Sequence, residues 1–203
     1  MSVFQTYLTL GFYHIISWQA TDHLTFLLAL CAPYVLADWR RVLALVTSFT
    51  VGHSLTLALA TLGLTRVNAP LVEALIPVTI MLTALDNMRR AGPAVARARR
   101  PVRSASVLWA APNALALAFG LIHGLGFSNY LRALLGGQHR PLTELLAFNL
   151  GVEVGQILVV SVILLCGFGL LRGLRVARRD WVLTVSGAAL GVAALLLLQL
   201  RSQ

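Results

Sequence analysis

The feature that most constrains this chain is a succession of apolar segments, each long enough to cross a lipid bilayer. A helix needs about 20 mainly apolar residues to span the hydrocarbon core. Only 11% of the residues are charged, whereas soluble domains carry about 25%. We therefore expect an all-α integral membrane protein that is embedded in the lipid bilayer. The six predicted spans are 20–38, 42–64, 69–88, 107–131, 142–171 and 181–200.

A further apolar segment, residues 3–18, precedes the first predicted span and is short for a crossing. It has no basic leading region and no small-residue cleavage site before Asp22, so we expect a helix that is retained rather than a signal peptide. Three alternatives stay open for it: an interfacial helix, a re-entrant segment or a seventh span. The predicted fold is a polytopic transmembrane helix bundle of six spans plus this short N-terminal helix. Residues 1–203 are predicted to form one integral membrane domain.

Positive charge is concentrated in loops that lie on one side of the predicted membrane. All sixteen basic residues are arginines, and six of them lie in RRAGPAVARARRPVR at 89–103. The positive-inside rule places such loops in the cytoplasm. We therefore predict a cytoplasmic linker at 89–106 and place Asp22 and His23 on the outer side, which is the periplasm in a Gram-negative cell. The same rule explains the net charge of +9 without nucleic-acid binding. The other arginines on this side are Arg40, Arg41, Arg172, Arg175, Arg178 and Arg179.

Polar side chains occur inside spans, where an unpaired charge costs roughly 2.5–3.5 kcal/mol. His53 lies near the middle of the second span, and His123 lies between Gly120 and Gly124 in the fourth. Small residues at this spacing let a second helix approach closely, so we expect neighbouring side chains to reach the His123 ring. Glu153 lies well inside the fifth span, and we expect it to face a partner helix or a water-filled path.

Neutral imidazoles and carboxylates together favour a first-row divalent metal. Two cysteines lie in apolar segments without metal-type spacing, so we do not expect thiolate ligands. The alternative is a polar network that only fastens helices together. Glu73 and Asp86 rank lower because they lie near helix ends, and His139 is expected to be an ordinary exposed loop residue. The predicted metal ligands are His14, Asp22, His23, His53, His123 and Glu153, with Ser54, Asn149 and Gln156 as supporting residues.

Five phrases in sequence order resemble the HupE/UreJ family of hydrogenase and urease accessory proteins. They are FYHIISWQATDHLTFLLAL, VTSFTVGHSLTLALA, VEALIPVTIMLTALDN, FGLIHGLGFSNYLRALLG and FNLGVEVGQILVV. The resemblance implies a small inner-membrane protein that moves nickel, or in some members cobalt, for metalloenzyme assembly. It also matches His14, Asp22 and His23 to the family's His and Asp-His motif. The chain departs from that motif because Ile15 stands in place of the proline and the segment before Asp22 is longer.

Three functions stay open from the sequence. The first is a permease for a divalent metal, with nickel ahead of zinc or cobalt, and it is not an enzyme. The second is an intramembrane zinc hydrolase with Asp22 or Glu153 as general base. The third is a metal sensor or a scaffold for metalloenzyme maturation proteins, which binds metal without moving it. The sequence assigns no oligomeric state and no coupling ion.

Overall fold

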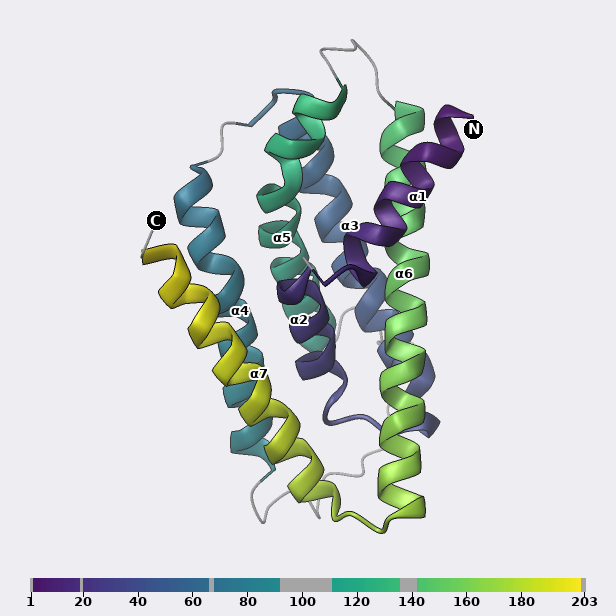
Figure 1. The fold of residues 1–203 in the computed structure, drawn as a ribbon, viewed down its shortest axis with the longest axis vertical. Coiled ribbons are helices and arrows are strands. Elements are labelled where there is room, and N and C mark those ends of the chain that lie inside the picture. Colours follow the sequence, from purple (N-terminus) through teal and green to yellow (C-terminus); the bar gives the residue numbers. More distant parts are fainter. Residues whose placement is uncertain (1, 19, 66–67, 92–110, 136–141, 202–203) are drawn as a thin grey trace.

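The computed structural model describes residues 2–18, 20–65, 68–91, 111–135 and 142–201, and in these ranges the chain forms helices and turns without a strand. The prediction of an all-α bundle is confirmed (Figure 1). The helices are α1 (Val3–Ile16), α2 (Thr21–Cys31), the short η1 (Leu36–Asp38), α3 (Trp39–Thr61), α4 (Ala69–Arg90), α5 (Ala111–Leu135), α6 (Leu142–Phe168), the π-turn η4 (Gly169–Gly173) and α7 (Arg178–Arg201).

Five of the described helices are long and apolar enough to cross a membrane: α3, α4, α5, α6 and α7. They correspond to the second through sixth predicted spans. α3 packs most extensively against α5, α1 packs along α6, and α7 packs along α4. The chain is therefore a polytopic membrane protein.

The predicted first span, 20–38, is wrong in its extent. α2 has only 11 residues and ends at Cys31, two positions before Pro33. Proline lacks a backbone N–H and restricts the residue before it, so an α-helix is not expected to continue through this point.

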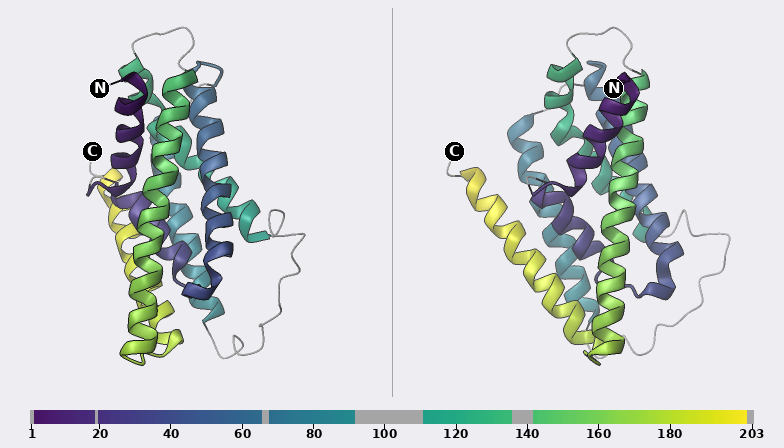
Figure 2. Two further views of the ribbon diagram at one scale, coloured as in Figure 1. Left: turned by 90° about the vertical axis from the view of Figure 1, so that its right-hand side faces the viewer. Right: turned by 45° about the vertical axis from the view of Figure 1, so that its right-hand side comes forward.

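α1 and α2 instead follow one another along the bundle. α1 starts at the same end of the bundle as α6 and descends to its middle, and α2 continues toward the opposite end (Figure 1). Figure 2 shows the two helices one above the other beside α6. With 14 and 11 residues, they reach about 21 and about 16 Å at 1.5 Å per residue. Together they cover a hydrocarbon core of about 30 Å, which neither helix spans alone.

Three of the described helices, α3, α4 and α7, have arginines at the same end of the bundle. α3 begins there with Arg40 and Arg41, α4 ends there with Arg89 and Arg90, and α7 begins there (Figure 1). Asp86 pairs with both Arg89 and Arg90, at 3.0 and 2.6 Å. Most of the predicted linker at 89–106 falls outside the described residues. We call this end the basic end, and the opposite end, where α1 and α6 begin, the cavity end.

Glycines set the closest helix contacts. A Cβ atom on Gly120 of α5 would collide with the backbone carbonyl oxygen of Phe49 on α3, and one on Gly124 would collide with that of His53. Gly151 of α6 meets the carbonyl of Leu8 on α1 in the same way. The close approach predicted from the spacing of Gly120 and Gly124 is confirmed, and it places His53 and His123 on adjoining helices.

We predict that Gly120→Ala destabilises the folded protein by about 1–3 kcal/mol, because the added methyl group must displace the backbone of α3. The matched control is Gly191→Ala in α7, where no atom lies within 4 Å of the added Cβ. The control gains helix propensity and should unfold at the same temperature as the wild type or slightly higher. Thermal unfolding in detergent measures both, and equal midpoints for the two variants would contradict this account of α3–α5 packing.

Candidate metal centre

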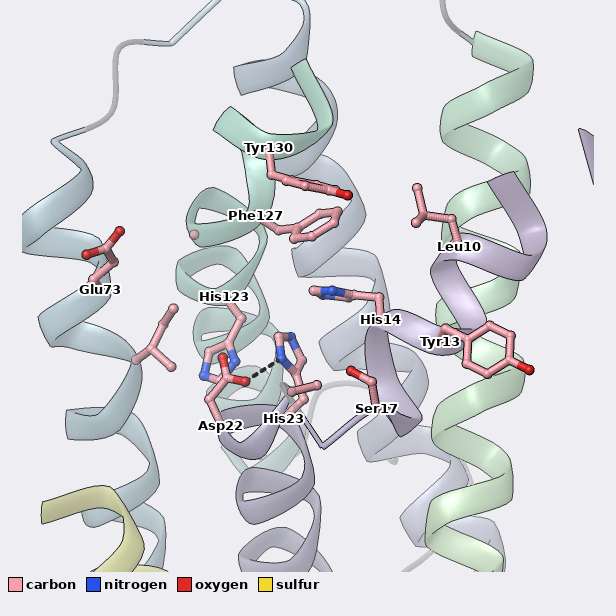
Figure 3. Close-up of a pocket in the computed structure, with 13 residues that line it drawn as sticks. Leu10, Tyr13, His14, Ser17, Asp22, His23, Glu73, His123, Phe127 and Tyr130 are labelled. Carbon is pink, nitrogen blue, oxygen red and sulfur yellow. Dashed lines mark hydrogen bonds and ion pairs between the residues drawn. The ribbon is translucent and has the colours of Figure 1, made fainter. Parts of the chain in front are cut away.

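A cavity of about 490 Å³ lies between α1, α2, α4 and α5. Its polar lining comes from all four helices or the turns beside them: His14, Ser17, Asp22, His23, Glu73 and His123. Glu73 and Tyr130 lie above the imidazoles, toward the cavity end of the bundle (Figure 3). Asp22 and His23 therefore lie at the level of the break between α1 and α2, deeper than the outer mouth that the sequence suggested.

Four histidines from four helices converge on this cavity and the space behind it. The ring of His23 lies 4.7 Å from His14, 5.2 Å from His123 and 6.0 Å from His53, measured between centroids. The His14 and His53 rings are 6.1 Å apart. These residues are separated by up to 109 positions in sequence, so only the fold brings them together. His23 is the common neighbour of the other three.

Ring nitrogens in this cluster are buried without a protein hydrogen-bond partner. They are Nε2 of His14, Nε2 of His23, both nitrogens of His53 and Nδ1 of His123. An unsatisfied buried polar group costs about 1–3 kcal/mol, and a single one usually has a bound water or ion that explains it. Each of the four neutral imidazoles carries one lone pair, so this cluster indicates a site for a ligand that accepts several lone pairs.

One carboxylate joins the imidazoles. The Oδ1 atom of Asp22 lies 3.1 Å from Nδ1 of His23. Two groups of potential metal ligands follow, and in each the three ligand atoms lie within 4.8 Å of one another. One group is Asp22, His23 and His123, and the other is His14, His23 and His53. Both donor sets consist of neutral nitrogen with at most one anionic oxygen, a mixture that suits nickel, cobalt or zinc.

Thr79 orients His123, and the sequence analysis did not identify it. The Thr79 hydroxyl donates to the carbonyl of Ile76 at 2.7 Å, and its oxygen lies 3.0 Å from Nε2 of His123. Because the hydroxyl hydrogen is already engaged, the oxygen accepts from an Nε2–H. Nδ1 of His123 then carries the lone pair, and Nδ1 is the nitrogen left without a partner.

Three polar residues of α6, Asn149, Glu153 and Gln156, lie on the side that faces α3, and Glu153 and Gln156 belong to neither ligand group. Glu153 accepts a hydrogen bond from Thr47 at 3.1 Å, and Gln156 accepts one from Thr50 at 2.7 Å. Asn149 lies beside His53 and donates to the Leu145 carbonyl. The structure thus brings together five of the six predicted ligands and places Glu153 elsewhere.

Two further residues differ in position from what the sequence suggested. Ser54 is half-buried on α3 and does not line the cavity, although it follows His53 directly. Glu73 does line the cavity, despite its position near a helix end. A helix-end carboxylate ordinarily faces solvent, and only the arrangement of α4 against α5 shows that this one faces the cluster.

We predict that Thr79→Val weakens metal binding about 10–100-fold, the usual effect of losing a group that orients a ligand histidine. Thr79→Ser keeps the hydroxyl and should bind like the wild type. Thr83→Val is the matched control, since Thr83 bonds only the Thr79 carbonyl among the contacts described for it. Isothermal titration gives the affinities, and the nitrogen NMR shifts of His123 report its tautomer. An unchanged tautomer in Thr79→Val would contradict the assignment.

Comparison with known proteins agrees with the resemblance found in the sequence. The family described as HupE / UreJ protein matches residues 1–201, nearly the whole chain. No curated protein and no solved structure matches the chain. The matched span includes every helix of the bundle and every residue of the histidine cluster, so the chain belongs to the HupE/UreJ family.

Proposed function

We propose that this protein moves a divalent transition-metal cation, nickel first, across the bacterial inner membrane for metalloenzyme maturation. The observation that carries the proposal is the group of five buried, unpartnered ring nitrogens beside Asp22. Each buried nitrogen without a partner costs free energy. Together, their lone pairs can stabilise a bound cation. Family membership supports handling of a metal, and the cavity supplies a route to the cluster from one end of the bundle.

The ligand chemistry favours nickel, cobalt or zinc over copper(I). Copper(I) prefers thiolate and thioether sulfur, and neither Cys31 nor Cys166 lines the cavity. A single carboxylate neutralises only half the charge of a dication. Binding is therefore weaker than in a structural metal site with several anionic ligands, as release requires.

The distribution of arginine supports an orientation of the bundle in the membrane, and the proposed supply of metalloenzymes requires inward transport. The positive-inside rule assigns the basic end to the cytoplasm and the cavity end to the periplasm. Beyond His53, polar side chains continue along α3 toward the basic end, first Thr50 with Gln156 and then Thr47 with Glu153. We assign the cation's onward path to this row, with Glu153 as its countercharge. Metalloenzyme maturation proteins then receive the metal on the cytoplasmic side.

We predict that liposomes containing the purified protein take up Ni²⁺, which an enclosed indicator dye detects. His23→Ala and Asp22→Asn should reduce the flux at least about tenfold, because both substitutions remove ligands from the cluster. Asp180→Asn is the matched control, an exposed carboxylate on α7 at the basic end. His139→Ala removes the one histidine outside the predicted ligand set and should leave the flux unchanged.

The same preparation separates the alternatives. Metal binding that depends on His23 without any flux would replace transport by the sensor or scaffold role. A tightly held zinc ion that does not exchange, together with hydrolysis of a lipid-soluble ester or peptide, would replace it by the hydrolase. Flux that is equal in the wild type and in His23→Ala would contradict the proposed route.

We further predict that Glu73→Gln slows Ni²⁺ uptake several-fold at low ionic strength, because an exposed carboxylate at the cavity mouth attracts cations. Salt screens this attraction, so the difference from the wild type should shrink as salt is added. Glu144→Gln is the control, since Glu144 lies in the first turn of α6 at the same end and does not line the cavity. An effect of equal size in Glu144→Gln would indicate general surface charge instead.

A further inference from the structure

His23 belongs to both groups of potential ligands. Asp22 and His123 make up the rest of one group, which lines the cavity entirely. His14 and His53 make up the rest of the other, and His53, with 0% of its surface exposed, lies behind the cavity lining. We name the first the cavity position and the second the buried position.

The two nitrogens of the His23 ring have different surroundings. Nδ1 lies 3.1 Å from the Asp22 carboxylate, and Nε2 is buried without a partner. A neutral imidazole carries one lone pair, on one nitrogen at a time. A neutral His23 can therefore bind metal at only one of the two positions at any moment.

We propose that the cluster holds one cation in two alternative positions and that His23 passes the cation from one to the other. This inference rests on the proposed function and adds its central step. At the cavity position the ligands are Asp22, Nδ1 of His23 and Nδ1 of His123. At the buried position they are Nε2 of His14, Nε2 of His23 and a nitrogen of His53.

The transfer is balanced in protons and ligands. With the cation at the cavity position, His23 carries its proton on Nε2. On transfer, that proton is lost to water as the ring moves and Nδ1 takes one from a cavity water, so the net proton change is zero. Asp22 is released as a ligand and accepts the new Nδ1–H, which holds the ring with Nε2 toward His14 and His53. A carboxylate behind a ligating histidine commonly fixes its orientation in this way.

Charge gives the two positions different roles. The cavity position contains the Asp22 carboxylate, so it attracts the incoming dication more strongly. The buried position offers neutral imidazoles alone, and the His23 ring separates it from Asp22. The cation is therefore held less firmly there. His53 is also the member of the cluster that lies on α3, the helix that carries Thr50 and Thr47 toward the basic end. Transfer to the buried position thus moves the cation toward the polar row that we assign to its exit.

The test uses Co²⁺ as a spectroscopic probe, because its visible absorption depends on the number and kind of its ligands. The full-length protein in detergent is titrated as wild type, His123→Gln, His53→Gln, His23→Gln and the control His139→Gln. We expect one Co²⁺ per chain in the wild type. His123→Gln and His53→Gln should each still bind one Co²⁺, with absorption spectra that differ from each other, whereas His23→Gln should bind at least about tenfold more weakly than either.

Flux in liposomes completes the test. His123→Gln and His53→Gln each remove a ligand that belongs to only one of the two positions. Both variants should bind Co²⁺ yet transport it at least about tenfold more slowly than the wild type and the control. Thermal unfolding identifies any variant that fails to fold, and Asn then replaces Gln at that position.

Two Co²⁺ ions per wild-type chain would overturn the inference, because both positions would then be filled at once although His23 can bind metal at only one of them. So would a His53→Gln variant that matches the wild type in spectrum and flux, and in that case the proposed transport would stand. A folded wild type that neither binds nor transports the ion would overturn both proposals.

Discussion

The arrangement of the whole bundle depends on the cost of burying imidazole nitrogens that nothing in the protein satisfies. His23, His53 and His123 are each at most 4% exposed, inside a bundle that is surrounded by lipid. Hydrogen bonds to protein groups satisfy only part of the cluster, namely His23 to Asp22 and His123 to Thr79. The remaining nitrogens converge instead of turning toward separate partners. The proposed shared cation would account for that convergence, whereas a network that only fastens helices would leave fewer unpartnered atoms.

Glycine packing makes the convergence sterically possible. Gly124 allows the backbone of α5 to touch that of α3 at His53, one residue after His123. On the other side of the cluster, Gly11 and Gly151 bring α1 against α6, which fixes the end of α1 where His14 lies. Helix association in a membrane gains little from the hydrophobic effect and depends on close packing. The same contacts that hold the bundle together therefore set the spacing between the ligands.

The sequence predicted the features that depend on a single segment. Apolar length located the five long helices, and burial cost singled out the histidines and Asp22 as a group. Glu153 was expected to face a partner helix or a water-filled path, and its side chain meets Thr47 of α3, as Gln156 meets Thr50. How far along α3 these contacts lie depends on the stagger of two distant helices, and so the separation of Glu153 from the cluster could not be derived. The role of Thr79 could not be predicted for a related reason: the sequence does not show which residue of another helix its hydroxyl contacts.

The break between α1 and α2 is the part of the fold that was hardest to predict from the sequence, and it lies beside the candidate metal centre. A continuous helix would satisfy its own backbone groups through the middle of the membrane, whereas two half-helices leave carbonyl groups at the end of α1 and N–H groups at the start of α2. The negative end of the α1 dipole lies where His14 sits in the last turn, so it favours a cation there. The positive end of α2 favours the ionised form of Asp22 in the first turn. Irregular backbone is tolerated at membrane depth where it lines a cavity, and here the cavity and the break coincide. The segment between His14 and Asp22 thus has a structural consequence: the chain presents a histidine from one half-helix and an Asp-His pair from the other to the same cavity.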